Sequence, residues 1–294
     1  MAPPRLFCFG LGYSARALAD DLMAEGWRVA GSCRSAEKQA ALRNAGIEAF
    51  LFDRGRPLED AAAALGGTTH LLSSVPPDAS GDPVLDQHAA DIAALTTLEW
   101  AGYLSTTGVY GDRAGGWVDE LSDLQPTGDR GRRRVSAEQG WLDLFRKNNT
   151  PVHIFRLAGI YGPGRNALET VRAGRARRII KPGQVFSRIH RDDIVAVLRA
   201  SLARGNPGAV YNLCDDEAAP PQDVIAFACD LLGVAPPPDL PFADADLSAM
   251  ARSFYRDNKR VSNRRIKQEL GVRFAWPDYR AGLRDLFAAQ ASSN

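Results

Sequence analysis

The sequence predicts an α/β fold in which a parallel sheet is covered by helices on both faces, and three observations favour this class. Short apolar runs of strand length alternate with helical patterns through the first half of the chain. The first of these runs leads directly into a glycine turn and then into a helical pattern. The 294 residues, 45% of them apolar, are enough for one large domain or for two unequal lobes.

Composition argues against several classes of protein. The formal net charge of +1 disfavours a nucleic-acid partner and an acidic, solvated chain. The four cysteines are scattered without a Cys-x-x-Cys pair, which disfavours a disulfide framework or a metal site and fits a reducing compartment. No apolar run reaches the roughly 18 residues of a membrane span, and the N-terminus has no signal-peptide pattern. We therefore expect a soluble cytoplasmic protein with no metal and no membrane partner.

The glycine turn has the spacing of a dinucleotide-binding motif. Residues 6–9 predict a buried strand, which is followed by Gly10-x-Gly12-x-x-Ala15 and a helical pattern. Gly10 permits a tight turn, Gly12 lets backbone approach a pyrophosphate, and Ala15 is small enough for the helix to pack on the sheet. Unpaired N–H groups and the positive end of the helix dipole suit a diphosphate. The alternative is a glycine turn that binds nothing.

The end of the second predicted strand, residues 27–33, indicates which cofactor is preferred. An acidic residue there would bind the adenine-ribose diol of NAD. The sequence instead has the hydroxyls of Ser32 and Ser35 together with Arg34 and Lys38. A guanidinium paired with a 2′-phosphate is a strong charge-assisted contact. We therefore favour NADP(H) over NAD(H), with a solvated Arg/Lys pair as the alternative.

Three further strands are expected at residues 47–53, 70–77 and 102–111. Asp53 either faces the adenine or caps the next turn. Because strand ends line the ligand crevice of such a sheet, residues 73–75 are candidate cofactor contacts. Ser105, Thr106 and Thr107 place three hydroxyls at the end of the fifth strand, either to bind a carbonyl or ribose or simply because threonine favours strands.

The other expected elements alternate less regularly in the second half. Helices are expected at residues 36–44, 58–65, 84–98, 126–149, 194–203, 220–232 and 263–270 and from residue 277, and strands at 152–157 and 209–214. Residues 236–238 are three prolines and predict a stiff linker.

Four motifs in order along nearly the whole chain resemble the extended short-chain dehydrogenase/reductase superfamily, in its NAD(P)-dependent epimerase/dehydratase branch. They are GLGYSA at 10–15, STTGVYG at 105–111, RLAGIYGPG at 156–164 and RIHRDD at 188–193. The resemblance implies a Rossmann-type doubly wound parallel sheet in residues 1–165, with a strand and a helix returning near 182–215. It also implies a smaller substrate-binding lobe in residues 166–294.

The resemblance implies a catalytic group that this chain has only in part. Thr106 holds the place of the family's substrate-polarising Ser/Thr, four residues before Tyr110. In the Tyr-x-x-x-Lys pair of the family, the tyrosine is the general acid/base and the lysine binds the nicotinamide ribose. Arg130 and Arg134 occupy these two places here. Arginine stays charged at any accessible pH and cannot transfer the proton, although Arg134 can still hold a ribose or phosphate.

Two functions are therefore open. The first is an oxidoreductase or epimerase/dehydratase for a sugar or nucleotide-sugar-like substrate, with Tyr110, Tyr161 or His190 as the replacement proton donor. The second is a non-catalytic NADP(H)-binding redox sensor or regulatory protein. The catalytic candidates are Thr106, Tyr110 and Arg134.

The family's other ligand positions also have counterparts in this sequence. The expected cofactor contacts are Gly10, Gly12, Tyr13, Ser14, Ala15, Ser32, Arg34, Ser35, Lys38, Asp53, Ser73, Ser74, Val75, Ser105, Leu157, Ala158, Gly159 and Ile160. The expected substrate contacts are Tyr161, Arg165, Arg188 and His190, with the two arginines as a clamp for a diphosphate.

Structural roles compete with some of these assignments in the second lobe. Asp192 and Asp193 are expected to cap the helix that begins at residue 194, and a structural hydrogen bond is the leading alternative for His190. The basic run at 172–181 is expected to be a solvated helix face. The resemblance also permits a homodimer.

Overall fold

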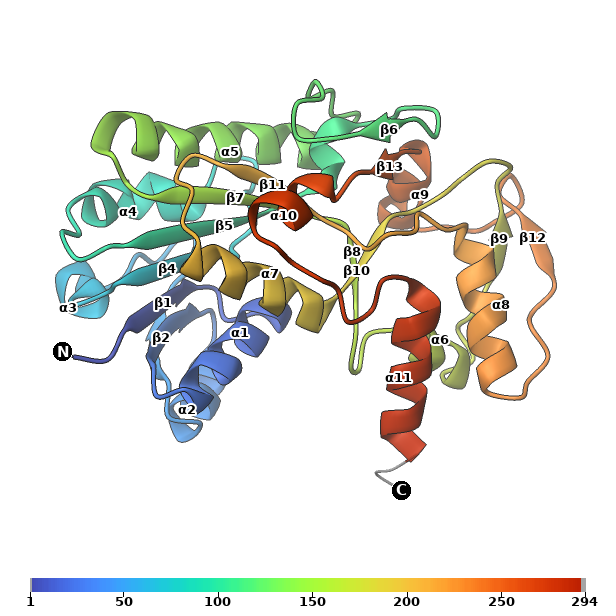
Figure 1. The fold of residues 1–294 in the computed structure, drawn as a ribbon, viewed down its shortest axis with the longest axis horizontal. Coiled ribbons are helices and arrows are strands. Elements are labelled where there is room, and N and C mark those ends of the chain that lie inside the picture. Colours follow the sequence, from blue (N-terminus) through green and yellow to red (C-terminus); the bar gives the residue numbers. More distant parts are fainter. Residues whose placement is uncertain (1, 292–294) are drawn as a thin grey trace. The chain divides into compact units, whose positions relative to one another are not determined.

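The computed structural model describes residues 2–291, and its central feature is a seven-stranded sheet. The strand order is β3-β2-β1-β4-β5-β7-β11, and β1 pairs in parallel with both β2 and β4 (Figure 1). The strands are β1 (Arg5–Phe9), β2 (Arg28–Cys33), β3 (Glu48–Leu51), β4 (His70–Ser73), β5 (Trp100–Thr106), β7 (Val152–Leu157) and β11 (Val210–Leu213). The order reverses at β1, which is the arrangement predicted for a doubly wound sheet.

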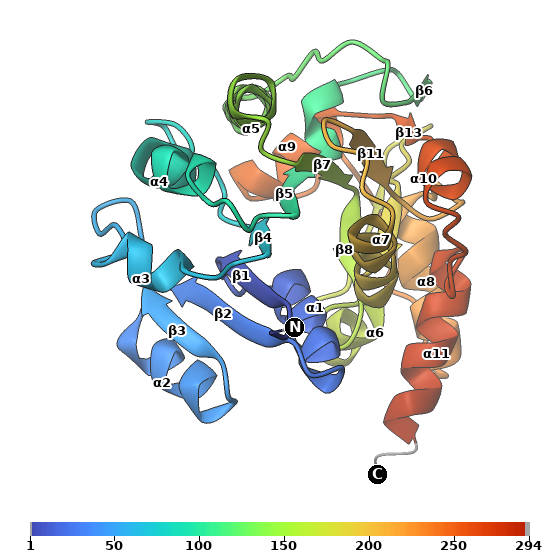
Figure 2. The same ribbon diagram turned by 60° about the vertical axis from the view of Figure 1, so that its left-hand side comes forward.

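Helices cover both faces of this sheet, as Figure 2 shows. One layer contains α3 (Ala61–Leu65), α4 (Pro83–Ala93) and α5 (Asp129–Asn148). The other contains α1 (Tyr13–Ala24), α2 (Ala36–Asn44) and the end of α7 (Arg191–Ala203). Arg199 of α7 forms ion pairs with Asp21 and Glu25 of α1. Because both faces are covered, the central strands are buried and mostly apolar, and every residue of β1 is buried.

Most predicted elements are present with small shifts at their ends. The helix predicted at 36–44 is α2, which begins after the N-cap Ser35. The helix expected to reach residue 98 ends at Ala93. The fifth strand ends at Thr106, and Thr107–Tyr110 forms a 3₁₀ helix instead of more strand. None of these differences changes the order of the sheet.

The chain divides into two compact units that are each assembled from three segments. The first contains residues up to Thr106, Asp129–Arg156 and Leu198–Tyr211, and the second contains the rest. The boundary near residue 165, with a return near 182–215, stays a prediction. In this division the chain enters the second unit at Thr107 and again at Leu157, and it returns to the first at Leu198.

The second unit has short parallel strand pairs and its own apolar core. Its strands are β6 (Trp117–Val118) with β13 (Arg260–Val261), β8 (Gly159–Tyr161) with β10 (Arg188–His190), and β9 (Arg178–Ile180) with β12 (Asp239–Pro241). Its helices include α6 (Ala167–Arg172), α8 (Pro221–Leu231), α9 (Ala249–Arg256), α10 (Arg264–Glu269) and α11 (Tyr279–Ala291). Leu168, Val224 and Leu283 belong to the core between α6, α8 and α11.

The expectation of a helix face at residues 172–181 is wrong. Helix α6 ends at Arg172, and Arg178–Ile180 is strand β9. Arg178 pairs with Asp239 of the neighbouring strand β12 at 2.6 Å. Among residues 2–291, no helix combines the length and the apolar character that crossing a membrane requires.

A buried ion pair joins α5 to two strands of the sheet. The Arg156 guanidinium donates to both oxygens of Glu138, with Nη2 2.7 Å from Oε2, and the Ser105 hydroxyl lies 2.5 Å from Oε1. All three residues are at most 4% exposed. A buried charge is tolerated when its partner and hydrogen bonds are complete, so this cluster fixes α5 against β5 and β7.

We predict that Glu138→Gln lowers the free energy of unfolding by about 3 kcal/mol or more, because it leaves the Arg156 charge buried without its counterion. The control is Asp143→Asn on the same helix, where exposed ion pairs to Arg146 and Lys147 are lost. That loss should have a much smaller effect, because solvent screens exposed ion pairs. Urea unfolding of both variants checks the prediction, and equal effects would contradict it.

Candidate functional site

The glycine turn is held between β2 and β4 by two serines. The Gly10 amide donates to Ser32 Oγ at 2.9 Å, and the Ser74 hydroxyl donates to the Gly10 carbonyl. Gly10 has φ +81°, and a Cβ there would lie 3.1 Å from Ser74 Oγ and from Val75 Cγ2. Gly10 is therefore required by both its backbone conformation and its neighbours. The structure brings together Gly10, Ser32, Ser74 and Val75, four of the residues expected at the cofactor.

The backbone amides of Gly10 and Gly12 are already bonded within the protein. The expectation that unpaired N–H groups of this turn suit a diphosphate therefore does not apply to these two amides. Gly10 donates to Ser32, and the Gly12 amide donates to the Gly10 carbonyl at 2.8 Å. Gly12 is the N-cap of α1, and within the described residues no side chain caps this helix. The amides of Ser14 and Ala15, in the first turn of α1, remain as candidate donors for an anion.

The expected NADP-selecting residues differ in how far they are already engaged. Lys38 donates from Nζ to the Leu11 carbonyl at 2.7 Å, and Ser35 accepts from the Lys38 amide as the N-cap of α2. Arg34 is exposed, and its guanidinium makes no hydrogen bond to any other residue between 2 and 291. Only Arg34 of this group therefore keeps its full capacity for a phosphate.

Asp53 takes part in the turn after β3. Its Oδ1 accepts from the Gly55 amide at 2.9 Å, and its Oδ2 pairs with Arg56 at 2.9 Å. Of the two expectations for this residue, the local turn is the one that the geometry shows. Arg56 also donates to the Arg34 carbonyl at 2.7 Å, so it links this turn to the end of β2.

The end of β4 adds one buried hydroxyl without a partner. Ser73 is completely buried, and within the described part of the chain its Oγ makes no hydrogen bond. Its neighbour Ser74 is engaged with Gly10. Ser73 is therefore a strand residue beneath the turn, whereas Ser74 and Val75 shape the turn itself.

Two of the catalytic candidates, Thr106 and Arg134, lie at the end of β5. Thr106 is half-buried at the last strand position, and the hydroxyl of Ser105 is committed to Glu138. Arg134 of α5 donates from Nη1 to the Leu104 carbonyl at 2.6 Å and to the Tyr103 hydroxyl at 3.0 Å. Arg130, one turn earlier, is exposed. Arg134 is thus an arginine anchored to strand β5.

A chain of buried contacts leads from Arg134 through Tyr103 and Trp141 to Asp82. Tyr103 stacks on Trp141 with ring centroids 5.6 Å apart, and the Trp141 indole donates to Asp82 at 3.1 Å. Burial raises the pKa of the Tyr103 phenol, which therefore stays protonated. Burial also raises the pKa of Asp82, whose other oxygen caps α4.

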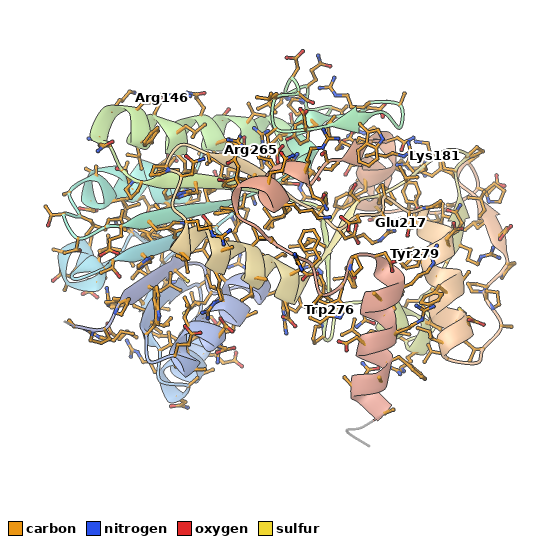
Figure 3. All side chains as sticks on the ribbon, in the orientation of Figure 1. Arg146, Lys181, Glu217, Arg265, Trp276 and Tyr279 are labelled. Carbon is orange, nitrogen blue, oxygen red and sulfur yellow. The ribbon has the colours of Figure 1, made fainter. Side chains whose placement is uncertain are left out.

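In the second unit, β8 and β10 bring the expected substrate residues together. Tyr161 and His190 are paired in register, and their rings meet edge to face at 5.2 Å. His190 lies 3.9 Å from the Trp276 ring, which is labelled with Tyr279 in Figure 3. The His190 Nδ1 accepts from the Asp192 amide at 3.2 Å, so the proton is on Nε2. This is the structural bond anticipated as the alternative for His190.

The three candidate proton donors all lie in buried surroundings. The Tyr110 hydroxyl donates to Asn212 at 2.7 Å, and the ring is completely buried. The Tyr161 hydroxyl donates to the Asp278 carbonyl at 3.3 Å, and burial raises the pKa of this phenol. Burial lowers the pKa of His190 and keeps it neutral. Each group therefore has a structural role in the geometry observed.

The two arginines expected to bind a diphosphate lie in different surroundings. The Arg188 Nη1 donates to the carbonyls of Phe186 and Ala219 at 2.8 and 3.0 Å. Arg165 is exposed in a turn closed by backbone bonds to Gly162. The remaining family positions are mostly buried, with Leu157 and Ala158 inside and only Gly159 exposed.

The capping role expected for Asp192 and Asp193 is wrong, because α7 begins at Arg191 and includes both residues. The Asp193 carboxylate instead accepts from the amides of Ala275 and Trp276 at 2.9 and 3.2 Å. It therefore fixes the segment before α11, which belongs to the same unit.

Sequence patterns alone missed the Ser105–Glu138–Arg156 cluster. Two signals pointed to it: Glu138 falls on the apolar face of α5 with Trp141, and Arg156 interrupts an apolar strand.

The four cysteines are free and buried. Within the described range, no three His, Cys, Asp or Glu side chains are grouped so as to hold a metal ion.

The chain is similar to proteins of known sequence and to solved structures. No protein-family model matches the chain. Protein YeeZ of Escherichia coli (strain K12) is 30% identical over 278 residues, which is 92% of this chain and 95% of that protein. A solved structure of a functionally unknown conserved protein from Silicibacter pomeroyi DSS is 54% identical, with a TM-score of 0.90 over 97% of this chain and 99% of the other.

A third similarity is in fold rather than in sequence. UDP-glucuronic acid 4-epimerase from Bacillus cereus, solved with UDP-glucuronic acid and NAD, has a TM-score of 0.79 at 16% identity. The match covers 99% of this chain and 100% of the epimerase. The chain thus shares the doubly wound α/β fold of this epimerase. By sequence, the chain belongs to the family of Protein YeeZ.

We predict a pH-dependent stability difference at Asp193. Burial raises the pKa of this carboxyl to about 6, from an ordinary value of about 4. Its contribution to stability is therefore complete below about pH 4 and is lost as the pH rises through about 6. Asp193→Asn cannot ionise, so the stability of the wild type relative to this variant should fall across that range. Urea unfolding at pH 4, 5, 6 and 7 checks this, and a constant difference would contradict it.

Proposed function

We propose that the chain binds a nicotinamide dinucleotide at the glycine turn between β1 and α1. On this proposal it acts as an oxidoreductase or epimerase/dehydratase on a sugar or nucleotide-sugar-like substrate. The observation that carries the binding proposal is Gly12. Its φ of −84° suits any residue, and a Cβ there would meet only Ser74 Oγ, at 3.9 Å. The fold itself therefore does not require glycine at this position, whereas a ligand that approaches the backbone closely does.

The uncapped start of α1 supports the same proposal. Serine, threonine or aspartate at an N-cap would bond to a first-turn amide and stabilise the helix by about 1 kcal/mol. Glycine at position 12 leaves the first-turn donors without a side-chain acceptor. A diphosphate would receive these hydrogen bonds together with the favourable end of the helix dipole. The fold neighbour with bound NAD and UDP-glucuronic acid supports the choice of ligand class.

The preference for NADP(H) is a finer part of the proposal and depends on Arg34. This guanidinium is exposed and uncommitted just past the end of β2, where the adenine ribose of a dinucleotide would lie. Arg56 is held by Asp53, and Lys38 by Leu11. We propose that Arg34 binds the 2′-phosphate.

The proposed chemistry would use Thr106 and Arg134 at the end of β5. The Thr106 hydroxyl would polarise the substrate, and Arg134 would keep a positive charge where the family has its lysine. A nicotinamide cofactor, when bound, supplies the hydride acceptor or donor. No exposed acid/base replaces the family tyrosine at position 130, so Tyr110 would have to leave its bond to Asn212 to serve.

That constraint favours a second candidate function, an NADP(H)-binding redox sensor without turnover. Arg130 cannot exchange a proton, and Tyr110, Tyr161 and His190 are all buried. A panel of UDP- and dTDP-sugars incubated with NADP⁺ or NADPH separates the two. Any change in nicotinamide absorbance that depends on both protein and sugar nucleotide contradicts the sensor.

We predict that Gly12→Ala lowers the affinity for NADPH by roughly tenfold or more, equivalent to about 1.4 kcal/mol, because the added methyl group blocks the pyrophosphate. Because alanine is a poorer N-cap than glycine, the free energy of unfolding should fall by up to about 1 kcal/mol, which leaves the protein folded for the titration. Titration followed by nicotinamide fluorescence gives the affinity. The control is Gly205→Ala, whose Cβ would meet nothing within 4 Å. Unchanged affinity in Gly12→Ala, or no binding of NADPH or NADH to the wild type, contradicts the proposal.

We predict that Arg34→Ala weakens NADPH binding by roughly tenfold to a hundredfold, the usual effect of losing a hydrogen bond to a charged group. NADH affinity should stay unchanged. The control is Arg146→Ala, an exposed arginine at the far end of α5 (Figure 3). An equal loss of affinity for NADPH and for NADH would show that Arg34 does not bind the 2′-phosphate.

A further inference from the structure

The first turns of α5 concentrate positive charge where a helix tolerates it least. Residues 129–134 contain four arginines and one aspartate, a surplus of three positive charges in a chain whose formal net charge is +1. Asp129 is engaged with Arg132 at 2.5 Å. Cations near a helix N-terminus oppose the helix dipole and are unfavourable there. An anion bound at this end of α5 would be favoured by both the arginines and the dipole.

Part of this charge faces the end of β5. Glu138 contacts Ser105, and Arg134, one turn earlier, contacts Tyr103 and Leu104. Residues four apart lie on one helix face. Arg130 is thus the outermost member of the same stripe, and exposure rises along it from buried Glu138 to half-buried Arg134 to exposed Arg130. The two arginines therefore lie on the helix face that is turned to the tip of β5, beside Thr106.

Arg134 is held so that one edge of its guanidinium stays available. Both hydrogens of Nη1 are used, one by Leu104 and one by Tyr103. Within residues 2–291, Nε and Nη2 make no hydrogen bond, and neither is a buried unpartnered atom. The Tyr103 ring lies 5.6 Å from the guanidinium carbon and is itself stacked on Trp141. The Nε–Nη2 edge is thus a fixed pair of parallel donors, the arrangement that suits a carboxylate or phosphate.

The carboxylates that the structure describes nearest to Arg134 make their hydrogen bonds to other groups. Asp82 bonds to Trp141 and to the first amides of α4. Glu138 is bound by Arg156 and Ser105, and Asp129 by Arg132. The open donors of the Arg134 guanidinium can therefore bind an external acceptor.

We propose that Arg134, assisted by Arg130, binds an oxyanion at the end of β5, and that this oxyanion is a carboxylate or phosphate group of the substrate. The arginines thus replace a proton-transfer pair by an anion receptor. Their assignment to a substrate rests on the proposed function, whereas the anion site itself can be measured without it. A bidentate fork held by the strand binds such a group with less loss of conformational entropy than a free lysine would.

The test uses the full chain saturated with NADPH, so that the glycine turn is occupied, and repeats each titration without NADPH. Inorganic phosphate and malonate are the probes, with chloride at the same ionic strength as the reference, and calorimetry measures affinity. We expect Arg134→Gln to weaken phosphate or malonate binding roughly tenfold or more, as for loss of a charged hydrogen bond. Arg134→Lys should lose much of the affinity while keeping the charge, and Arg130→Gln should lose several-fold. Arg146→Gln is the matched control on the same helix.

The outcomes separate this proposal from the proposed function. Anion binding that depends on Arg134 and Arg130 supports the site even if NADPH fails to bind. Anion affinity that is unchanged in both Arg134→Gln and Arg130→Gln, or matched by chloride, overturns it even if NADPH binds. If circular dichroism shows that Arg134→Gln does not fold, the exposed Arg130→Gln decides. A preference for phosphate or for malonate identifies which oxyanion the substrate carries.

Discussion

The glycine turn depends on Gly10 being fastened from both sides, and this fastening positions the start of α1. Ser32 of β2 accepts from its amide, and Ser74 beyond β4 donates to its carbonyl. Because β2 and β4 flank β1 on opposite sides, the two bonds place the turn over the point where the strand order reverses. Gly10 is required by the conformation and the neighbours of the turn, whereas Gly12 leaves space beside the backbone.

Helix α5 combines packing contacts and charged residues on one face. Glu138 and Trp141 hold the buried end of the helix through Arg156 and Asp82. Arg134 lies one turn before Glu138 and contacts Leu104 and Tyr103, and the Tyr103 ring stacks on Trp141. The contacts that fix the helix and the arginine with open donors are therefore neighbours in one cluster.

Local patterns were sufficient for elements whose signals are local. The helix at 36–44 has a serine N-cap and a glycine after its end, and the structure has the same bounds. The start of α7 was placed three residues late, because apolar periodicity begins at Ile194 while its first turn is polar. Residues 178–180, which form strand β9, were predicted as helix. Their partner strand β12 lies some sixty residues away, so no local sequence pattern indicates the pairing. At the site, the turn was foreseeable, but long-range bonds such as Glu138–Arg156 and Asp193–Trp276 were not.

The interleaving of the two units has a consequence for biosynthesis. The edge strand β11 lies at residues 210–213, after the chain has already supplied two segments to the second unit. A nascent polypeptide cannot complete this sheet until β11 has left the ribosome, so the edge of β7 stays unpaired until then. Exposed edges of this kind promote aggregation. The late synthesis of β11 therefore makes this edge a place where aggregation can begin.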